Sequence, residues 1–340
     1  MTNTLSIAAL GAGYFSQFHL EAWQRNPATQ MIAIADQDIS KARETGISKI
    51  YSELDSMLAS CSPDILDIIT PPFTHLSAIE AACEYPVKAI VCQKPFCSNI
   101  KEAETAIAIA HHAGIALFVH ENFRFQPWYR CMKKCISEGS IGKPIQFTFR
   151  LRTGDGQGPQ AYLDRQPYFR KMEHFLIHET GVHWVDTFQY LFGNVRSVYA
   201  DTRQLNPVIR GEDCAWFIFE HENQIRSVFD GNRLLDHSAD NHRLTLGEAM
   251  LEGTDATVTL NGDGEVALRK FGTKDTTILL PAQQWPGFGG DCVYALQAHV
   301  ADVVINGSEP ENLASDYLPV MRLVDTIYRS ARYSTKIQVG

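Results

Sequence analysis

Short apolar runs alternate with helical patterns over the first 120 residues of the chain. The runs are LSIAAL (5–10), MIAIAD (31–36), DILDIIT (64–70), KAIVCQ (88–93) and IALFVH (115–120). Strands buried on both faces of a sheet read as continuous apolar runs, and intervening helices imply right-handed crossovers. The pattern therefore predicts an α/β domain with a doubly wound parallel sheet.

Beyond residue 123 the pattern changes to longer runs in which apolar and polar residues alternate. These runs are PIQFTFRLR (144–152), VRSVYADTRQL (195–205), DCAWFIFEHE (213–222) and QIRSVFDGNRL (224–234). Alternation with a period of two is typical of half-buried antiparallel strands, so we expect a largely antiparallel open sheet. HFLIHETGVHWVDTFQYLF (174–192) predicts one long helix packed against it. We expect two domains, residues 1–122 and an α+β domain of residues 123–340.

Composition narrows the choice of partners. Hydrophobic residues make up 45% and charged residues 20% of the 340 residues, as in soluble globular proteins. The net charge of −9 opposes attraction to nucleic acid or an anionic membrane, and no apolar run approaches the ~20 residues needed to span a bilayer. The first ten residues resemble no export signal. We therefore expect a cytoplasmic protein with a small-molecule partner.

The eight cysteines form no Cys-x-x-Cys pair, which indicates reduced thiols. Cys131 and Cys135 lie one helical turn apart, but without a second ligand pair they predict no zinc site.

A glycine-rich turn follows the first apolar run. In LSIAALGAGYFSQFHLEAW, Gly11 and Gly13 precede a helical pattern, and Ser16 stands at the third glycine position of the dinucleotide-binding fingerprint. Glycines there let main-chain N–H groups approach a pyrophosphate at the helix N-terminus. The sequence thus predicts a Rossmann domain that binds a dinucleotide.

Asp36 ends the second apolar run, twenty residues beyond Ser16. A carboxylate there accepts hydrogen bonds from the adenosine ribose and repels a 2′-phosphate, so we expect NAD rather than NADP. The alternative is that Asp36 is only a strand-end turn residue.

Further motifs follow the later strands: ITPPFTH (69–75), CQKPF (92–96), ENFRF (121–125) and, in the second half, ETGVHWVD (179–186). Together with the glycine turn, these resemble the Gfo/Idh/MocA family of oxidoreductases over essentially the whole chain. The resemblance implies NAD-dependent oxidation of a sugar or cyclitol by a protein with a C-terminal domain for substrate binding and oligomerisation. A homodimer or homotetramer is expected, because the open sheet has one face that needs cover.

The resemblance also assigns residues. Lys94 corresponds to the lysine of a Glu-Lys-Pro motif and His183 to a catalytic histidine, but Gln93 and Glu179 stand where the family usually has glutamate and aspartate. The implied cofactor-binding residues are Gly11, Gly13, Tyr14, Phe15, Asp36, Thr70, Pro71, His75 and Gln93. Candidate substrate contacts are Arg124, Arg152, Tyr168 and His178.

Reaction chemistry suits these residues. Oxidising an alcohol requires a base for the hydroxyl proton, and histidine titrates near neutrality. On an α-helix Glu179 would lie one turn before His183 and could orient it, with Asp186 on the same side, while Lys94 would stabilise negative charge on the substrate oxygen. The alternatives are that Lys94 is a solvated turn residue and His183 a packed helix residue.

No metal is expected at the histidine-rich stretch. His178 and His183 are five residues apart, which on an α-helix turns their side chains about 140° apart. His174 and His178, spaced by four beside Glu179, leave a metal site as a minor alternative.

Two other functions stay open. One is an NAD-dependent glycoside hydrolase or related enzyme that oxidises its substrate transiently and regenerates NAD. The other is a non-catalytic nucleotide sensor, suggested by the loss of the glutamate at Gln93.

Overall fold

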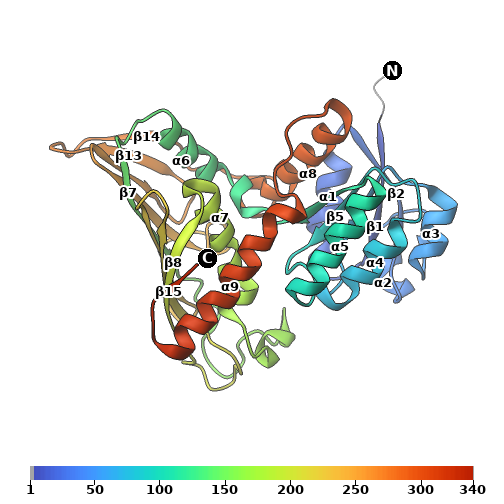
Figure 1. Ribbon diagram of the computed structural model, residues 1–340, viewed down its shortest axis with the longest axis horizontal. Helices are drawn as coiled ribbons and strands as arrows, with labels where there is room; N and C mark the ends of the chain where they lie inside the picture. Colours follow the sequence, from blue (N-terminus) through green and yellow to red (C-terminus); the bar gives the residue numbers. More distant parts are fainter. Residues whose placement is uncertain (1–3, 340) are drawn as a thin grey trace. The chain divides into compact units, whose positions relative to one another are not determined.

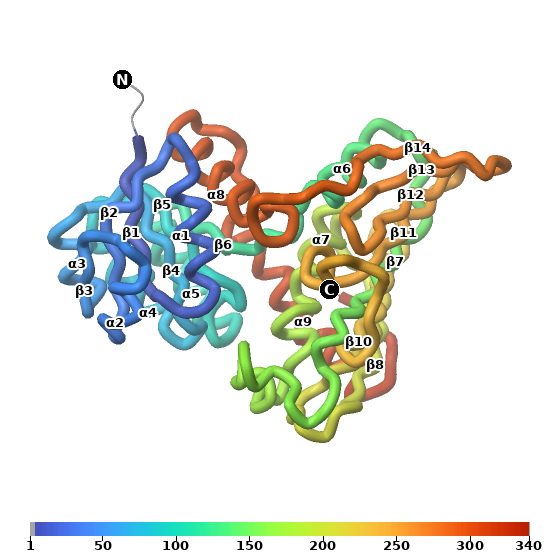
Figure 2. Tube along the Cα trace, turned by 180° about the vertical axis from the view of Figure 1, so that it is seen from behind, coloured from blue at the N-terminus to red at the C-terminus, as the bar shows by residue number. Residues whose placement is uncertain are grey.

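The computed structural model describes residues 4–339 of the chain, which form two compact units (Figures 1 and 2). The first unit comprises the chain up to Asn122 together with Cys292–Met321. The second comprises Phe123–Asp291 and the chain from Arg322 onward. The sequence predicts domains of residues 1–122 and 123–340, whereas in the structure Cys292–Met321 belongs to the first unit. No helix within residues 4–339 is long and apolar enough to cross a membrane.

The first unit contains a parallel sheet of order β3-β2-β1-β4-β5-β6, so the predicted doubly wound sheet is confirmed. Its strands are β1 Leu5–Leu10, β2 Thr29–Ala35, β3 Ile50–Tyr51, β4 Ile65–Ile68, β5 Ala89–Gln93 and β6 Ala116–His120. Strand order reverses between β1 and β4, and ligands bind at the carboxyl ends of the strands at such a reversal.

Helices flank this sheet (Figure 1). They are α1 Ser16–Arg25, α2 Ile39–Glu44, α3 Leu54–Cys61, α4 His75–Ala82 and α5 Ile100–Ala113, with a 3₁₀ turn at Pro72–Thr74. Local sequence sets the ends of α5: Asn99 caps the first turn by accepting a hydrogen bond from Glu102 N at 3.0 Å, and Gly114 ends the helix with a φ of 70°.

The segment Cys292–Met321 joins the first unit through contacts that a sequence pattern does not reveal. It contains most of α8 (Phe288–Asn306) and the start of α9 (Ala314–Tyr333). Asn122 donates to Cys292 Sγ at 2.9 Å, and the Arg25 guanidinium lies 4.3 Å from the centre of the Tyr294 ring. These contacts tie the segment to α1 and to the residues that directly follow β6.

The second unit contains a sheet of order β14-β13-β12-β11-β7-β10-β9-β8-β15. Its strands are β7 Pro144–Leu151, β8 Val195–Arg203, β9 Cys214–His221, β10 Arg226–Asn232, β11 Gly247–Gly253, β12 Ala256–Leu260, β13 Val266–Lys270, β14 Thr276–Leu280 and β15 Ile337–Gln338. Among the described strands of this second sheet, only β7 and β10 pair in parallel, so the predicted largely antiparallel sheet is confirmed.

Helices cover one face of this sheet. These are α6 Pro127–Ser137, α7 Val182–Phe192 and the part of α9 from Arg322, with short 3₁₀ turns at Phe123–Phe125 and Pro167–Lys171. Trp184 of α7 stacks on Phe149 of β7 at 4.1 Å, and Phe188 packs edge-on against Phe217 of β9 at 6.1 Å. The alternation in β9 buries every second side chain against these helices, as the period of two requires.

The prediction of one long helix over residues 174–192 is wrong. Leu176–Gly181 forms a π-helix, and α7 begins only at Val182. The buried carboxylate of Glu212 explains the difference, because it accepts hydrogen bonds from the main-chain nitrogens of Phe175 and Ile177 at 3.1 and 3.0 Å. A side chain distant in sequence thus holds the first turn in a wider form, and π-helical turns of this kind are frequent at functional sites.

Candidate nucleotide-binding and catalytic site

The loop after β1 requires its glycines. Gly11 has a φ of +106°, and a side chain there would meet Thr70 Cγ2 at 3.0 Å. At Gly13 nothing lies within 4 Å of the position that a Cβ would take, so space is open above the loop. Ser16 begins α1 and donates its hydroxyl to Gly13 O at 2.7 Å, and no side-chain hydrogen bond caps the helix at Phe15. This arrangement fits the approach of a pyrophosphate.

Asp36 ties the end of β2 to the glycine loop. Its Oδ2 accepts a hydrogen bond from Ala12 N at 2.6 Å, and its Oδ1 accepts one from Asp38 N at 2.8 Å. A carboxylate offers about four acceptor positions, so two remain for the hydroxyl groups of a ribose. The residue is half-buried. Its negative charge therefore lies beside the loop where a dinucleotide would bind.

His75 connects two loops at the carboxyl edge of the sheet. Cys97 N donates to its Nδ1 at 3.2 Å, so Nε2 carries the proton that is donated to Thr70 O at 2.8 Å. Burial lowers the pKa of His75 to about 4, and the ring is neutral at physiological pH. Both ring nitrogens are engaged within the protein, so His75 supports the Thr70 and Pro71 loop rather than offering a ring nitrogen to a cofactor.

Gln93 ends β5 and points its amide inward. Its Oε1 accepts a hydrogen bond from Lys94 N at 2.7 Å, and its Nε2 lies 3.0 Å from His19 Nε2. Lys94 is half-buried and follows the last residue of the strand. Gly11, Thr70 and Lys94 therefore follow the neighbouring parallel strands β1, β4 and β5 at their carboxyl ends, which brings them to one edge of the sheet.

In the second unit, His183 lies in the first turn of α7. Its ring stacks on Phe123 with 3.8 Å between the centroids and 4° between the planes, and it is 7% exposed. Glu179, in contrast, lies in the preceding π-helix. Residues four apart lie one turn apart only when both are in the same α-helix, and Glu179 and His183 are in helices of different type. The pairing of Glu179 with His183 therefore stays a prediction.

Two of the candidate substrate residues are held in ion pairs. Arg124 donates from Nε and Nη2 to Asp186 at 2.9 and 2.5 Å, which engages the Asp186 carboxylate with an arginine. Arg152 is buried and donates to Asp230 Oδ2 at 2.5 Å and to Asp230 O at 2.7 Å, joining β7 to β10. Both guanidinium groups therefore have structural partners.

Of the other two substrate candidates, His178 lies in the π-helix and Tyr168 lies in the 3₁₀ turn at Pro167–Lys171. Main-chain N of His178 donates to the Tyr328 hydroxyl at 3.1 Å, and that hydroxyl donates to Glu212 at 2.6 Å. Desolvation, followed by the negative charge of Glu179, raises the pKa of Tyr168. Tyr168 and Glu179 are thus electrostatic neighbours within the second unit.

Sequence reasoning missed Arg233, which joins the loop of residues 153–175 to the π-helix. It is 4% exposed, donates to both Asp155 oxygens at 3.1 and 3.0 Å, and donates to the Thr180 hydroxyl. Three aromatic rings surround its guanidinium, those of Tyr162, Phe169 and Phe175. A single arginine after a strand reads in sequence like any solvated residue, so no local signal identifies this role.

Burial alone would raise the pKa of Asp155. The charge of Arg233, hydrogen bonds from Thr153 and Arg233, and the charge of Arg165 together outweigh burial and lower that pKa. Asp155 is therefore ionised and balances the buried arginine.

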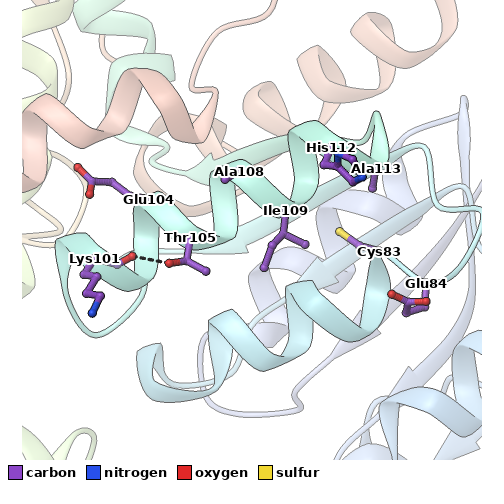
Figure 3. Close-up of a pocket in the computed structure, with 9 residues that line it drawn as sticks. All are labelled: Cys83, Glu84, Lys101, Glu104, Thr105, Ala108, Ile109, His112 and Ala113. Carbon is purple, nitrogen blue, oxygen red and sulfur yellow. Dashed lines mark hydrogen bonds between the residues drawn. The ribbon is translucent and has the colours of Figure 1, made fainter.

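A separate groove of about 690 Å³ lies along α5 (Figure 3). Its lining consists of Cys83, Glu84, Lys101, Glu104, Thr105, Ala108, Ile109, His112 and Ala113. It shares no residue with the glycine loop, Asp36 or Lys94. Within residues 4–339 no group of three or more histidine, cysteine, aspartate or glutamate side chains could hold a metal ion.

Comparisons with known proteins match both halves of the chain. Residues 5–121 match the family described as "Oxidoreductase family, NAD-binding Rossmann fold", and residues 129–258 match the "GFO/IDH/MocA C-terminal domain". D-apiose dehydrogenase of Paraburkholderia graminis is 31% identical over 98% of this chain and 89% of its own length. Myo-inositol 2-dehydrogenase of Thermotoga maritima is 26% identical over 67% of this chain and 69% of its own length.

Solved structures include a close match. An oxidoreductase from Agrobacterium radiobacter, determined in complex with NAD⁺, L-tartaric acid and magnesium, is 26% identical with a TM-score of 0.88, covering 98% of each chain.

Proposed function

The chain belongs to the GFO/IDH/MocA family of NAD-binding oxidoreductases, and on that premise we propose that it oxidises a hydroxyl group of a sugar or cyclitol. The relative at 31% identity over 98% of the chain acts on D-apiose by name, and a second named relative acts on myo-inositol. The observation that carries the proposal is the glycine loop tied to Asp36 by the 2.6 Å hydrogen bond from Ala12 N.

NAD fits the residues at this loop. Gly13 leaves room for close main-chain approach, the start of α1 attracts a pyrophosphate, and Asp36 has acceptor positions for ribose hydroxyls. When bound, NAD supplies the acceptor for the hydride that leaves the substrate carbon. Asp36 selects against a 2′-phosphate through its charge.

His183 is proposed to take the hydroxyl proton. Its stacking on Phe123 fixes the plane of the ring, which a general base needs because the proton moves along one line. Glu179 is proposed to orient the ring or stabilise the imidazolium. Lys94 is proposed to stabilise negative charge on the substrate oxygen.

The loop carrying Tyr168 is proposed to select the substrate. Arg233 joins Asp155 of this loop to Thr180 of the π-helix, and Tyr168, which is 53% exposed, lies where the charge of Glu179 contributes to raising its pKa. A hydroxyl that both donates and accepts hydrogen bonds suits a polyol. Arg124 and Arg152 are proposed to shape the site through Asp186 and Asp230 rather than to bind substrate directly.

A panel of D-apiose, myo-inositol and common aldoses tests this function by the absorbance of NADH. We expect NADH to accumulate in proportion to substrate consumed with at least one member. Glycoside cleavage with no net NADH would instead support the hydrolase alternative. NAD binding without turnover of any member would support the sensor alternative.

A homodimer or homotetramer is proposed through the uncovered face of the second sheet. Figures 1 and 2 agree that no described helix lies on that face. Tyr199, Ile218, Val228, Thr148 and Met250 lie in one row across it, from β8 to β11. Tyr199 and Met250 are 37% and 43% exposed. A row of mainly apolar side chains, interrupted only by Thr148, across an open sheet face suits a self-complementary interface.

Light scattering of the wild type and of Ile218→Asp at micromolar concentration tests the assembly. We expect an oligomer that the substitution dissociates, whereas Thr105→Asp, at an exposed position of α5 in the first unit, leaves the mass unchanged. A monomeric wild type would rule the interface out. A cytoplasmic location is proposed from the reduced cysteines, all eight of which are free thiols.

A further inference from the structure

A buried chain of polar side chains runs from the core of the first unit to the main chain of Lys94. Asp67 of β4 and His19 of α1 are both 0% exposed, and Gln93 of β5 is 9% exposed. His19 Nδ1 lies 2.8 Å from Asp67 Oδ2, and His19 Nε2 lies 3.0 Å from Gln93 Nε2. Gln93 Oε1 then accepts from Lys94 N at 2.7 Å. All four groups lie within one unit, at hydrogen-bonding distances.

The direction of every hydrogen bond follows from groups that can only donate. The main-chain N–H of Lys94 must donate, so the atom of Gln93 facing it is the oxygen. The NH₂ group of Gln93 therefore faces His19 Nε2, which must hold a lone pair. The proton of the ring is then on Nδ1 and is donated to Asp67. Trp23 Nε1, another obligate donor, contacts the same Asp67 oxygen at 2.7 Å, which confirms that this oxygen accepts.

The other groups around His19 do not change this assignment. The ring of His120, from β6, stacks on His19 with 3.9 Å between centroids, and the Phe15 ring lies edge-on at 5.6 Å. Burial, then Cys97 and Asp67, raises the pKa of the Cys92 thiol well above its usual value, so the thiol stays neutral. Asp67 accepts a hydrogen bond from the ring on one side, and Gln93 donates one to it on the other.

We propose that Gln93 sets the protonation state of this buried chain and holds the main chain of Lys94 in place. Its amide donates to a neutral imidazole on one side and accepts from Lys94 N on the other. Neither hydrogen bond requires the buried chain to take up an additional proton. A carboxylate at this position would accept from Lys94 N equally well. Its second oxygen, however, would face the lone pair of His19 Nε2, and two lone pairs at 3.0 Å repel unless a proton lies between them.

Gln93 and His19 are thus positioning residues for Lys94. The family resemblance leads one to expect a glutamate at position 93. A glutamate there could hold Lys94 N without repulsion from His19 only after the buried chain had taken up a proton, whereas Gln93 holds Lys94 N independently of pH. The catalytic consequence rests on the proposed function, because it matters only if Lys94 contacts substrate. The protonation state of His19 does not rest on it.

Equilibrium unfolding by urea as a function of pH tests the proposal with Gln93→Glu. Above about pH 6.5 an unfolded histidine is mostly neutral and an unfolded glutamate is ionised. The folded variant therefore holds one more proton than its unfolded state, and its stability falls as the pH rises. We expect its unfolding equilibrium constant to increase about tenfold per pH unit relative to the wild type between about pH 7 and pH 9.

The double variant His19→Gln with Gln93→Glu is the matched control. The introduced amide at position 19 can donate to the carboxylate, so the extra pH dependence should disappear relative to His19→Gln alone. An unfolding curve of Gln93→Glu with the pH dependence of the wild type would overturn the proposal.

A second measurement uses the wild-type protein and no ligand, so it holds even if Gln93→Glu does not fold. In ¹⁵N spectra of the histidine side chains, the signals lost in His19→Gln identify His19. In the neutral ring we expect an unprotonated Nε2 and a protonated Nδ1, measured between about pH 8 and pH 9. A protonated Nε2 would overturn the proposal while leaving the dehydrogenase function untouched. Absent dehydrogenase activity would not alter these spectra.

Discussion

Asp36 accepts a hydrogen bond from the main-chain nitrogen of Ala12 at 2.6 Å, which joins the end of β2 to the glycine turn after β1. One carboxylate thereby shapes the loop that would hold the pyrophosphate and places its charge where the adenosine ribose would lie. The preference for NAD over NADP follows from that single contact, because the group that orders the loop also repels a 2′-phosphate.

Asp36→Ser should therefore weaken NAD binding by about tenfold or more, since charge-assisted hydrogen bonds contribute roughly 1.5–3 kcal/mol. NADP binding should improve, because the repulsion is removed. Calorimetric titration of both cofactors measures the two effects. Asp36→Asn is the matched control that removes the charge but keeps an acceptor for Ala12 N. A wild type that binds NADP as tightly as NAD would contradict this prediction.

His75 should make the protein sensitive to acid. Its pKa is about 4 in the folded state because of burial, against 6.5 for the ordinary group, so the unfolded chain takes up a proton first as the pH falls. The stability contributed by neutral His75 is present above about pH 6.5 and is lost as the pH falls towards about 4. The loss is on the order of 3 kcal/mol, at 1.36 kcal/mol per pH unit.

Urea unfolding of wild type and His75→Gln between about pH 4 and pH 7 measures this loss. The variant should lose less stability with acid than the wild type, even though it starts from a lower value. His221, whose pKa burial also lowers, stays in both proteins and cancels in the difference. Parallel curves would show that His75 does not carry the acid sensitivity.

Arg233 should be among the costly residues to replace in the second unit. Arg233→Met removes the buried partner of the Asp155 carboxylate, which is 27% exposed and keeps Arg165. Breaking a buried ion pair costs about 3–5 kcal/mol, and the partial exposure of Asp155 puts the expected cost at the lower end of that range. Arg165→Met removes the other partner of Asp155 from a position 29% exposed, so it should cost roughly 1 kcal/mol or less. Denaturant unfolding of both variants tests the comparison, and equal losses would refute the central role of Arg233.

Much of the fold could be predicted from the sequence because it depends on local periodicity. Continuous apolar runs such as residues 88–93 are strands buried on both faces, and the alternation in residues 213–222 reflects one covered face. The glycine turn and Asp36 could be found as well, since a short motif fixes their geometry.

What the sequence did not reveal depends on contacts between distant residues. Glu212 converts the start of the predicted long helix into a π-helix, and Arg233 fastens the same turn to Asp155. Neither residue differs in its local pattern from a solvated charge. Likewise, the inward-facing amide of Gln93 depends on His19, which is 74 residues away in the chain.

Turnover of His183→Asn tests whether His183 takes the hydroxyl proton, with NADH formation, NAD affinity and melting temperature measured on the same preparations. Loss of the stack on Phe123 should lower the melting temperature by a few degrees, since such a pair contributes about 0.5–1.5 kcal/mol. Phe123→Leu removes the same stack but keeps the imidazole, and it serves as the control. If His183 is the general base, turnover falls about a hundredfold or more below that of the wild type and well below that of the control, with NAD affinity preserved. Turnover per folded molecule close to that of the wild type, with only the melting temperature lowered, would contradict that role.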